Sequence, residues 1–210
     1  MPRQAPINIW HGVDYQTVCK LVSPGAHVLD LGCGSGELLK MLHEKCNTSG
    51  QGIEINEELV VQCVNNGIPV IHHDLDTGLT DFTDNSYDYV ILNQTLQVVK
   101  NPKLVITEML RIGKRAIVSF PNFGNYRHRL QLFFGGNMPR TKALPYQWYD
   151  TPNIHLFTIK DFHHFCRTFN ITILKKLPVS IRSGGRGGKK VLVHPNLFAQ
   201  FAVFLLTKEK

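Results

Sequence analysis

The chain has 210 residues, of which 43% are hydrophobic and 19% are charged, and this size and composition suit one globular domain. Its longest apolar stretches, such as residues 201–206, are far shorter than the roughly 18 residues that a membrane-spanning helix needs, so we expect no membrane association. The first four residues lack the apolar run of a secretory signal, and we expect a cytoplasmic protein.

The cysteines and histidines do not show the spacing of a metal or disulfide site. No C-x-x-C pair occurs, and the histidine pairs at 72–73 and 163–164 lack the i,i+4 spacing of helical metal ligands. We therefore expect no metal site and reduced thiols. The five cysteines are Cys19, Cys33, Cys46, Cys63 and Cys166.

Basic residues exceed acidic residues by 23 to 16, which gives a net charge of +7. Much of this surplus lies late in the chain. A cluster of basic residues can mark a surface that binds nucleic acid, but it more often belongs to a solvated loop. Residues 183–190 are rich in glycine as well as basic, and we expect them to form a flexible loop that does not bind nucleic acid. The late basic residues are Lys175, Lys176, Arg182, Arg186, Lys189 and Lys190.

The first 120 residues alternate between short apolar runs and helical patterns, as parallel βαβ units do. The pattern predicts strands at 27–31, 52–55, 68–72, 87–92 and 115–120. It predicts helices at 37–45, from the N-cap Asn56 to near Gly67, and at 103–112 after the cap Asn101 and Pro102. The runs are apolar on both faces, so we expect helices to cover both faces of the sheet.

After Pro121 the periodicity weakens, and no helix or strand is predicted for residues 121–157. A capping box at 158–161 predicts a helix whose inward side chains are Phe162, Phe165, Cys166 and Phe169. Residues 171–174 and 201–206 are the last predicted strands. The sequence thus predicts one Rossmann-like α/β domain, residues 1–210, with a mostly parallel sheet of seven strands. The periodic pattern covers residues 25–120, and the less regular part covers 121–178.

A glycine-rich segment, Asp30-Leu31-Gly32-Cys33-Gly34-Ser35-Gly36, lies between the first strand and the first of these helices. Glycines there allow a tight turn and a close approach of the backbone to a ligand. The third glycine of a dinucleotide fingerprint would stand where Glu37 is, and a carboxylate would repel a pyrophosphate. Led by Asp30, the segment favours a cationic ligand over NAD.

Polar residues follow the next three strands, whose carboxyl ends border the crevice of an open α/β sheet. Glu54 stands 18 residues after Gly36, close to the spacing of a ribose-binding carboxylate, and the alternative is a solvent-facing strand end. Asp74 follows the third strand and Asn93 the fourth. The residues 74–76 can equally form an Asx-type turn. The predicted cofactor-binding residues are Asp30, Gly32, Gly34, Gly36, Glu54, Ile55, Asp74, Leu75 and Asn93.

These residues resemble class I S-adenosylmethionine-dependent methyltransferases over about residues 25–120. Longer blocks at 93–97 (NQTLQ), 108–111 (EMLR), 119–124 (SFPNFG) and 148–155 (WYDTPNIH) are similar to the methionine biosynthesis protein W (MetW) family. This resemblance covers residues 10 to about 178, although Asn125 and Tyr126 depart from the His-Trp expected there. It implies S-adenosyl-L-methionine as cofactor, with Asp74 beside the adenine, and a role in methionine biosynthesis with homoserine O-acetyltransferase as partner. In this resemblance residues 25–120 are the cofactor half, and 121–178 face an acceptor or partner.

The resemblance does not name a methyl acceptor, and methyl transfer mainly requires an aligned nucleophile. Residues 93–96 lack the prolines of nucleic-acid amino-methyltransferases, and no Pro-Cys nucleophile occurs. Candidates on the acceptor side are Asn122, Tyr149, Asp150 and His155, with His128; each can instead be structural. Alternatives to the accessory role are a small-molecule methyltransferase and, more weakly, an RNA methyltransferase.

Residues 119–155 combine aromatic with arginine side chains, the types enriched at interface hot spots. We expect this segment to cover the methionine end of the cofactor site and to contact the acetyltransferase. The alternative is a lid that packs only on itself.

Overall fold

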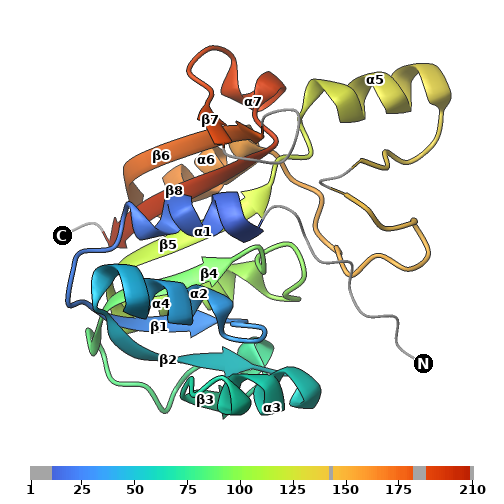
Figure 1. The fold of residues 1–210 in the computed structure, drawn as a ribbon. Coiled ribbons are helices and arrows are strands. Elements are labelled where there is room, and N and C mark those ends of the chain that lie inside the picture. Colours follow the sequence, from blue (N-terminus) through green and yellow to red (C-terminus); the bar gives the residue numbers. More distant parts are fainter. Residues whose placement is uncertain (1–10, 142–143, 182–187, 209–210) are drawn as a thin grey trace.

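The computed structural model describes residues 11–141, 144–181 and 188–208, and its centre is one eight-stranded sheet with helices on both faces (Figure 1). The strand order is β3-β2-β1-β4-β5-β8-β6-β7. The predicted α/β architecture with a mostly parallel sheet is confirmed.

Five strands run parallel and form the half of the sheet that was predicted to hold the cofactor. Four residues of β1 and seven of β5 are buried, as expected for strands covered on both faces. The sequence placed all five strands, with ends that differ by up to three residues. Their bounds are β1 His27–Leu31, β2 Ser49–Glu54, β3 Val70–His72, β4 Tyr87–Asn93 and β5 Gly113–Pro121.

The remaining strands are β6 (Ile171–Ile181), β7 (Gly188–Lys190) and β8 (Phe201–Lys208), and each pairs antiparallel with its neighbours. β6 continues well beyond the predicted residue 174 because it pairs with β8 along its length, with a bulge between Ile173 and Lys175. The prediction of a loop up to residue 190 is wrong for its last three residues, which form the eighth strand. Residues 182–187 lie outside the described residues.

Each face of the sheet has its own core. On one face α1 (His11–Cys19), α2 (Glu37–Cys46) and α3 (Glu57–Asn65) contribute Val18, Leu42 and Cys63 to the first core. On the other, α4 (Pro102–Ile112) and α6 (Ile159–Thr168) contribute Met109 and Phe162 to the second. Burial of these apolar stripes supplies most of the stabilisation.

The predicted helix caps are present. The side chains of Asn56, Asn101 and Thr158 accept hydrogen bonds from backbone N–H groups in the first turns of α3, α4 and α6, and Thr158 forms the capping box. In α6, Phe162 and Cys166 are buried and Phe165 packs against the core, but Phe169 is 41% exposed because it follows the last turn.

One helix, α5 (Tyr126–Gly135), extends away from the sheet (Figure 1). It lies in the segment for which no element was predicted, and only its His128 is buried. Two short helices complete the fold: the 3-10 helix η1 (Leu75–Thr77) and α7 (Pro195–Phe198). Among the described residues, no helix has the length and apolar character needed to cross a bilayer, and no group of three potential metal ligands comes together.

Candidate functional site

The turn between β1 and α2 depends on glycine. Gly32, Gly34 and Gly36 have φ angles of +70°, +59° and +80°, a region that other residues rarely adopt. A Cβ on Gly32 would stand 2.8 Å from the Thr95 side chain, whereas a Cβ on Gly34 would meet no atom within 4 Å. The turn therefore packs tightly on one side and is open at Gly34, where a ligand can approach the backbone.

Glu54, at the end of β2, is 7% exposed and holds this turn in place. Its Oε2 accepts a hydrogen bond of 2.9 Å from the backbone N–H of Gly34, and its Oε1 accepts bonds of 2.9 Å from those of Ile55 and Asn56. A carboxylate oxygen can accept about two hydrogen bonds. With the bonds that the described residues make, Oε2 thus keeps one acceptor position unused.

Asp30, in β1, is 2% exposed, and its Oδ1 has no hydrogen-bond partner among the described residues. Burial, together with the nearby charge of Glu54, raises the pKa of Asp30 to about 8. A buried oxygen without a partner is costly, and few occur in native proteins. This carboxyl suits a ligand that brings a positive charge or an N–H donor.

A second buried polar cluster stands at the ends of β4 and β5, and the sequence analysis missed its central residue, Asp14 of α1. The Ser119 hydroxyl lies 3.1 Å from Oδ2 of Asp14 and 2.6 Å from Oδ1 of Asn93. Gln94, which has a left-handed φ of 55°, donates its backbone N–H to Ser119 O at 3.1 Å. Burial raises the pKa of Asp14 to about 7, although hydrogen bonds from Gln94, Ser119 and Asn93 oppose the shift.

The third strand contributes Asp74, whose Oδ1 accepts a 2.9 Å hydrogen bond from the backbone N–H of Asp76. The Asx-type turn that the sequence left open is thus present, and it caps η1. Next to this turn, Leu75 is buried, while Ile55 after β2 is 58% exposed. β3, β2, β1 and β4 are neighbours in the sheet. All nine predicted cofactor residues therefore lie at the same end of the sheet, where the carboxyl ends of these parallel strands meet.

The acceptor-side candidates differ in their surroundings. Asn122 is fully buried, and its amide bonds to Ala199 O, Asn196 O and the N–H of Gly124, which makes it a structural link. Asp150 is exposed and accepts a bond from Gln147 N.

The candidates with aromatic rings, Tyr149, His155 and His128, also differ in their surroundings. Tyr149 is 69% exposed, whereas His155 has a buried Nε2 without a partner among the described residues. His128 is buried, which lowers its pKa, and its Nε2 lies 3.0 Å from the Thr141 hydroxyl. Within the described residues, no hydrogen bond joins any two of the side chains of Asn122, Tyr149, Asp150 and His155, and their role on the acceptor side stays a prediction.

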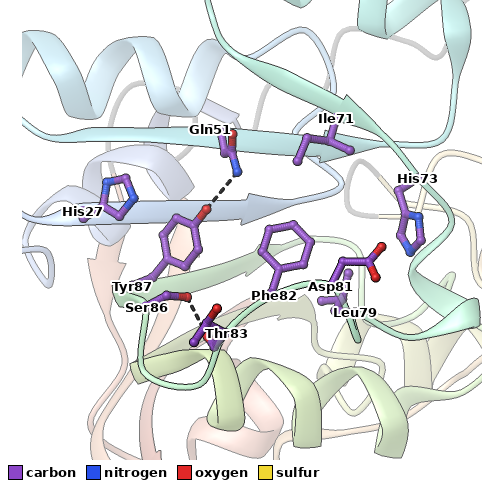
Figure 2. A pocket seen from close by; sticks show the side chains of 10 residues that line it. All are labelled: His27, Gln51, Ile71, His73, Leu79, Asp81, Phe82, Thr83, Ser86 and Tyr87. Carbon is purple, nitrogen blue, oxygen red and sulfur yellow. Dashed lines mark hydrogen bonds between the residues drawn. The ribbon is translucent and has the colours of Figure 1, made fainter.

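A separate hollow of about 410 Å³ lies between the face of the sheet and the segment that precedes β4, and Figure 2 shows the side chains that line it. Gln51 donates to the Tyr87 hydroxyl at 2.8 Å, and the rings of His27 and Tyr87 stack 4.5 Å apart (Figure 2). None of the nine predicted cofactor residues lines it. Its lining residues are His27, Gln51, Ile71, His73, Leu79, Asp81, Phe82, Thr83, Ser86 and Tyr87.

Solved structures with the same architecture include S-adenosylmethionine-dependent methyltransferases. One is a possible histamine N-methyltransferase from Thermotoga maritima, with a TM-score of 0.68 and 18% identity over 95% of this chain and 93% of that one. Another comes from Mesorhizobium loti, with a TM-score of 0.65 and 14% identity over 93% of this chain and 98% of that one. At these identities the likeness establishes the fold, and the predicted class I methyltransferase fold is confirmed.

A curated relative is the bifunctional methionine biosynthesis protein MetXA/MetW of Rhodopirellula baltica. It is 35% identical over 213 residues, which cover 97% of this chain and 34% of that protein, so the chain spans about a third of the relative's length. The model of the family "Methionine biosynthesis protein MetW" matches residues 12–206. The chain therefore belongs to the MetW family, as the blocks at residues 93–97 and 148–155 predicted.

Proposed function

We propose that this chain binds S-adenosyl-L-methionine or its demethylated product at the carboxyl ends of β1–β4, and that it acts in methionine biosynthesis beside homoserine O-acetyltransferase. The observation that carries the cofactor proposal is the buried Oδ1 of Asp30, which no group in the described part of the chain bonds, next to the open glycine turn. A cationic ligand would satisfy this carboxyl, and S-adenosyl-L-methionine carries both a sulfonium and an ammonium group.

Each predicted residue has a role in this proposal. Asp30 pairs with the ammonium group, Glu54 accepts from the ribose hydroxyls through the free position on Oε2, and Asp74 stands beside the adenine. Ile55 and Leu75 give the base apolar contacts, Asn93 contributes a polar side chain, and the open backbone at Gly34 allows close approach, with Gly32 and Gly36 shaping the turn. When bound, the cofactor supplies a methyl group on a positively charged sulfur.

A second candidate function is methyl transfer to a small molecule, and the Asp14 cluster favours it. A carboxyl whose pKa is about 7 can hold or release a proton near neutral pH. Asp14 also stands with Ser119 at the ends of the strands that border the crevice. A methylated product formed from cell extract in the presence of the cofactor, and lost in Asp14→Asn, would support this function over the accessory role.

The cofactor proposal is tested by calorimetry with S-adenosyl-L-methionine and S-adenosylhomocysteine on the wild type, Asp30→Asn and the matched control Asp81→Asn. Asp81 is exposed and outside the site. Loss of a charge-assisted bond costs about 1.5–3 kcal/mol, so we expect Asp30→Asn to bind about 10- to 150-fold more weakly, and Asp81→Asn to match the wild type. Absence of binding to the wild type would refute the proposal.

The partner proposal draws on the relative whose name joins MetXA to MetW. In this chain, the surface that suits a partner is an apolar arm, which we define as α5 and the segment 144–156. It carries large exposed side chains, whereas monomeric proteins rarely expose large contiguous apolar patches. The exposed fractions are 81% for Phe133, 78% for Phe134, 74% for Trp148, 69% for Tyr149 and 51% for Leu132.

The partner proposal is tested by co-purifying the full chain with the homoserine O-acetyltransferase of the same organism. A stable complex is the expected result. A pair that never associates at micromolar concentration would refute this part and leave the cofactor proposal untouched, because the arm includes none of the nine predicted cofactor residues.

A further inference from the structure

A second hollow, of about 630 Å³, lies between α5, α6, β6 and α7. None of the nine predicted cofactor residues lines it, and neither does any residue of the first 120. Four separate elements meet there, so its walls are fixed by the packing of α6 on β6 and α7 rather than by one loop. The lining residues are Arg129, Ile159, Lys160, His163, Arg167, Lys176, His194, Pro195, Asn196 and Leu197.

The lining of this hollow is positively charged. Four side chains carry a permanent charge, namely Arg129, Lys160, Arg167 and Lys176, and no aspartate or glutamate is among the lining residues. Within the described residues, all three ion pairs lie elsewhere, between residues 84 and 114. Four cations without an acidic partner around one hollow repel one another, and an anion would relieve this repulsion.

The basic residues of the whole chain are also concentrated in the part that contains this hollow. Residues 121–210 hold 14 of the 23 basic residues and 3 of the 16 acidic residues. The half of the chain that carries the cofactor site is therefore acidic, and the half that carries this hollow is strongly basic. Such a field attracts anions to the second half before any contact forms.

Two contacts hold the cations toward the hollow. Nζ of Lys176 donates to Nε2 of His163 at 3.1 Å. Burial, and the charges of Lys176 and Arg167, lower the pKa of His163, so its ring is neutral at pH 7 and accepts this bond. The Nε of Arg129 donates to Gly124 O at 2.7 Å, and its two terminal nitrogens make no bond within the described residues, which leaves them for a ligand.

We infer that this hollow binds a small anion with two or more phosphate groups. Arginine guanidinium groups match phosphate oxygens two at a time, and lysines add point charges. The hollow contains no aromatic ring other than histidine on which a base of single-stranded nucleic acid could stack. The hollow is concave and bordered by four elements, which suits a small molecule.

The test uses the full chain at 0.15 M salt and inorganic pyrophosphate as the probe, with calorimetry as the readout. The variants are Lys176→Gln and Arg167→Gln, and the matched control is Lys175→Gln, an exposed neighbour that does not line the hollow. Thermal unfolding shows that each variant is folded. We expect the wild type and Lys175→Gln to bind pyrophosphate alike, and each of the other two to bind about 10- to 150-fold more weakly, the range for one lost charge-assisted bond.

Three outcomes would overturn the inference. They are no binding of pyrophosphate to the wild type at millimolar concentration, equal binding by all the folded variants, and tighter binding of an oligoglutamate peptide than of pyrophosphate. The last result would assign the basic surface to an acidic protein segment.

Discussion

The backbone N–H of Gly34 donates a 2.9 Å hydrogen bond to Oε2 of Glu54 and so ties the turn after β1 to the end of β2, twenty residues later in the chain. The spacing in the sequence assigns the Glu54 carboxylate to a ligand. In the structure this carboxylate also shapes the glycine turn that would bind the same ligand. Loss of Glu54 should for this reason affect folding and binding together.

We predict that Glu54→Ala lowers the free energy of unfolding by about 2–4 kcal/mol, because three backbone N–H groups lose a charged acceptor in a nearly buried site. Affinity for S-adenosyl-L-methionine should fall by about 10- to 150-fold or more. Denaturant unfolding and calorimetry measure the two effects. The control is Glu44→Ala, an exposed glutamate in α2, and equal affinity in both variants would rule out the ribose role.

Gly34 and Gly25 offer a matched pair. Both have a left-handed φ, +59° and +74°, and at both a Cβ would meet no atom within 4 Å. An alanine in this conformation costs about 1–2 kcal/mol, so both variants should lose similar stability. Only Gly34→Ala should lose cofactor affinity, because only Gly34 lies at the candidate site. If Gly34→Ala bound the cofactor as tightly as Gly25→Ala, the ligand would not occupy the open space at Gly34.

The buried carboxyl of Asp30 predicts how stability depends on pH. Its pKa is about 8 in the folded chain and near 3.8 when the group is unperturbed. Between these values the unfolded chain binds fewer protons than the folded one, so stability should fall as pH rises from 4 to 8, by up to about 1.4 kcal/mol per pH unit for one group. Asp14, with a pKa of about 7, adds to this slope. Denaturant unfolding at several pH values should show a shallower slope for Asp30→Asn; an unchanged slope would contradict the assignment.

Binding should show the opposite trend. A cationic ligand favours the ionised form of Asp30, so affinity for S-adenosyl-L-methionine should rise between pH 5.5 and 7.5, by up to tenfold per pH unit. Calorimetry at three pH values measures the trend, and the Asp30→Asn variant should show a flatter profile. An affinity that falls with rising pH in the wild type would show that Asp30 does not pair with the ligand's charge.

For the partner, we predict that Trp148→Ala and Phe133→Ala in the apolar arm weaken association with the acetyltransferase by about 30-fold, the effect of losing a hot-spot side chain that contributes about 2 kcal/mol. Leu192→Ala is the control, since Leu192 is 77% exposed but lies outside the arm. Quantitative co-purification of folded variants provides the measurement. Equal recovery with all three variants would place the contact elsewhere.

Much of the parallel half of the fold is predictable from sequence because its signals are local. The glycine turn, the caps Asn56 and Asn101, and short strands that are apolar on both faces each depend on a few neighbouring residues. The candidate cofactor residues follow from the same rule, since parallel strands place their carboxyl ends at one edge of the sheet.

The features that sequence reasoning missed depend on distant parts of the chain. Helix α5 has no apolar stripe toward a core, so its sequence shows no helical period. Asp14 is buried because α1 packs against α2 and β8, which brings this carboxyl to Ser119 of β5, 105 residues away in the chain. β7 exists through its pairing with β6, and nothing in three residues of glycine and lysine indicates a strand.

The two edges of the sheet have a consequence for the chain's behaviour at high concentration. Both outermost strands, β3 and β7, are only three residues long, and β7 carries the exposed Lys189 and Lys190. A short edge strand offers another chain few unpaired backbone groups, and the two lysines of β7 would also repel a second copy. Both edges of the sheet therefore disfavour edge-to-edge aggregation, and the exposed aromatic side chains of the apolar arm would be a more favourable surface for contacts between copies of this chain in the absence of a partner.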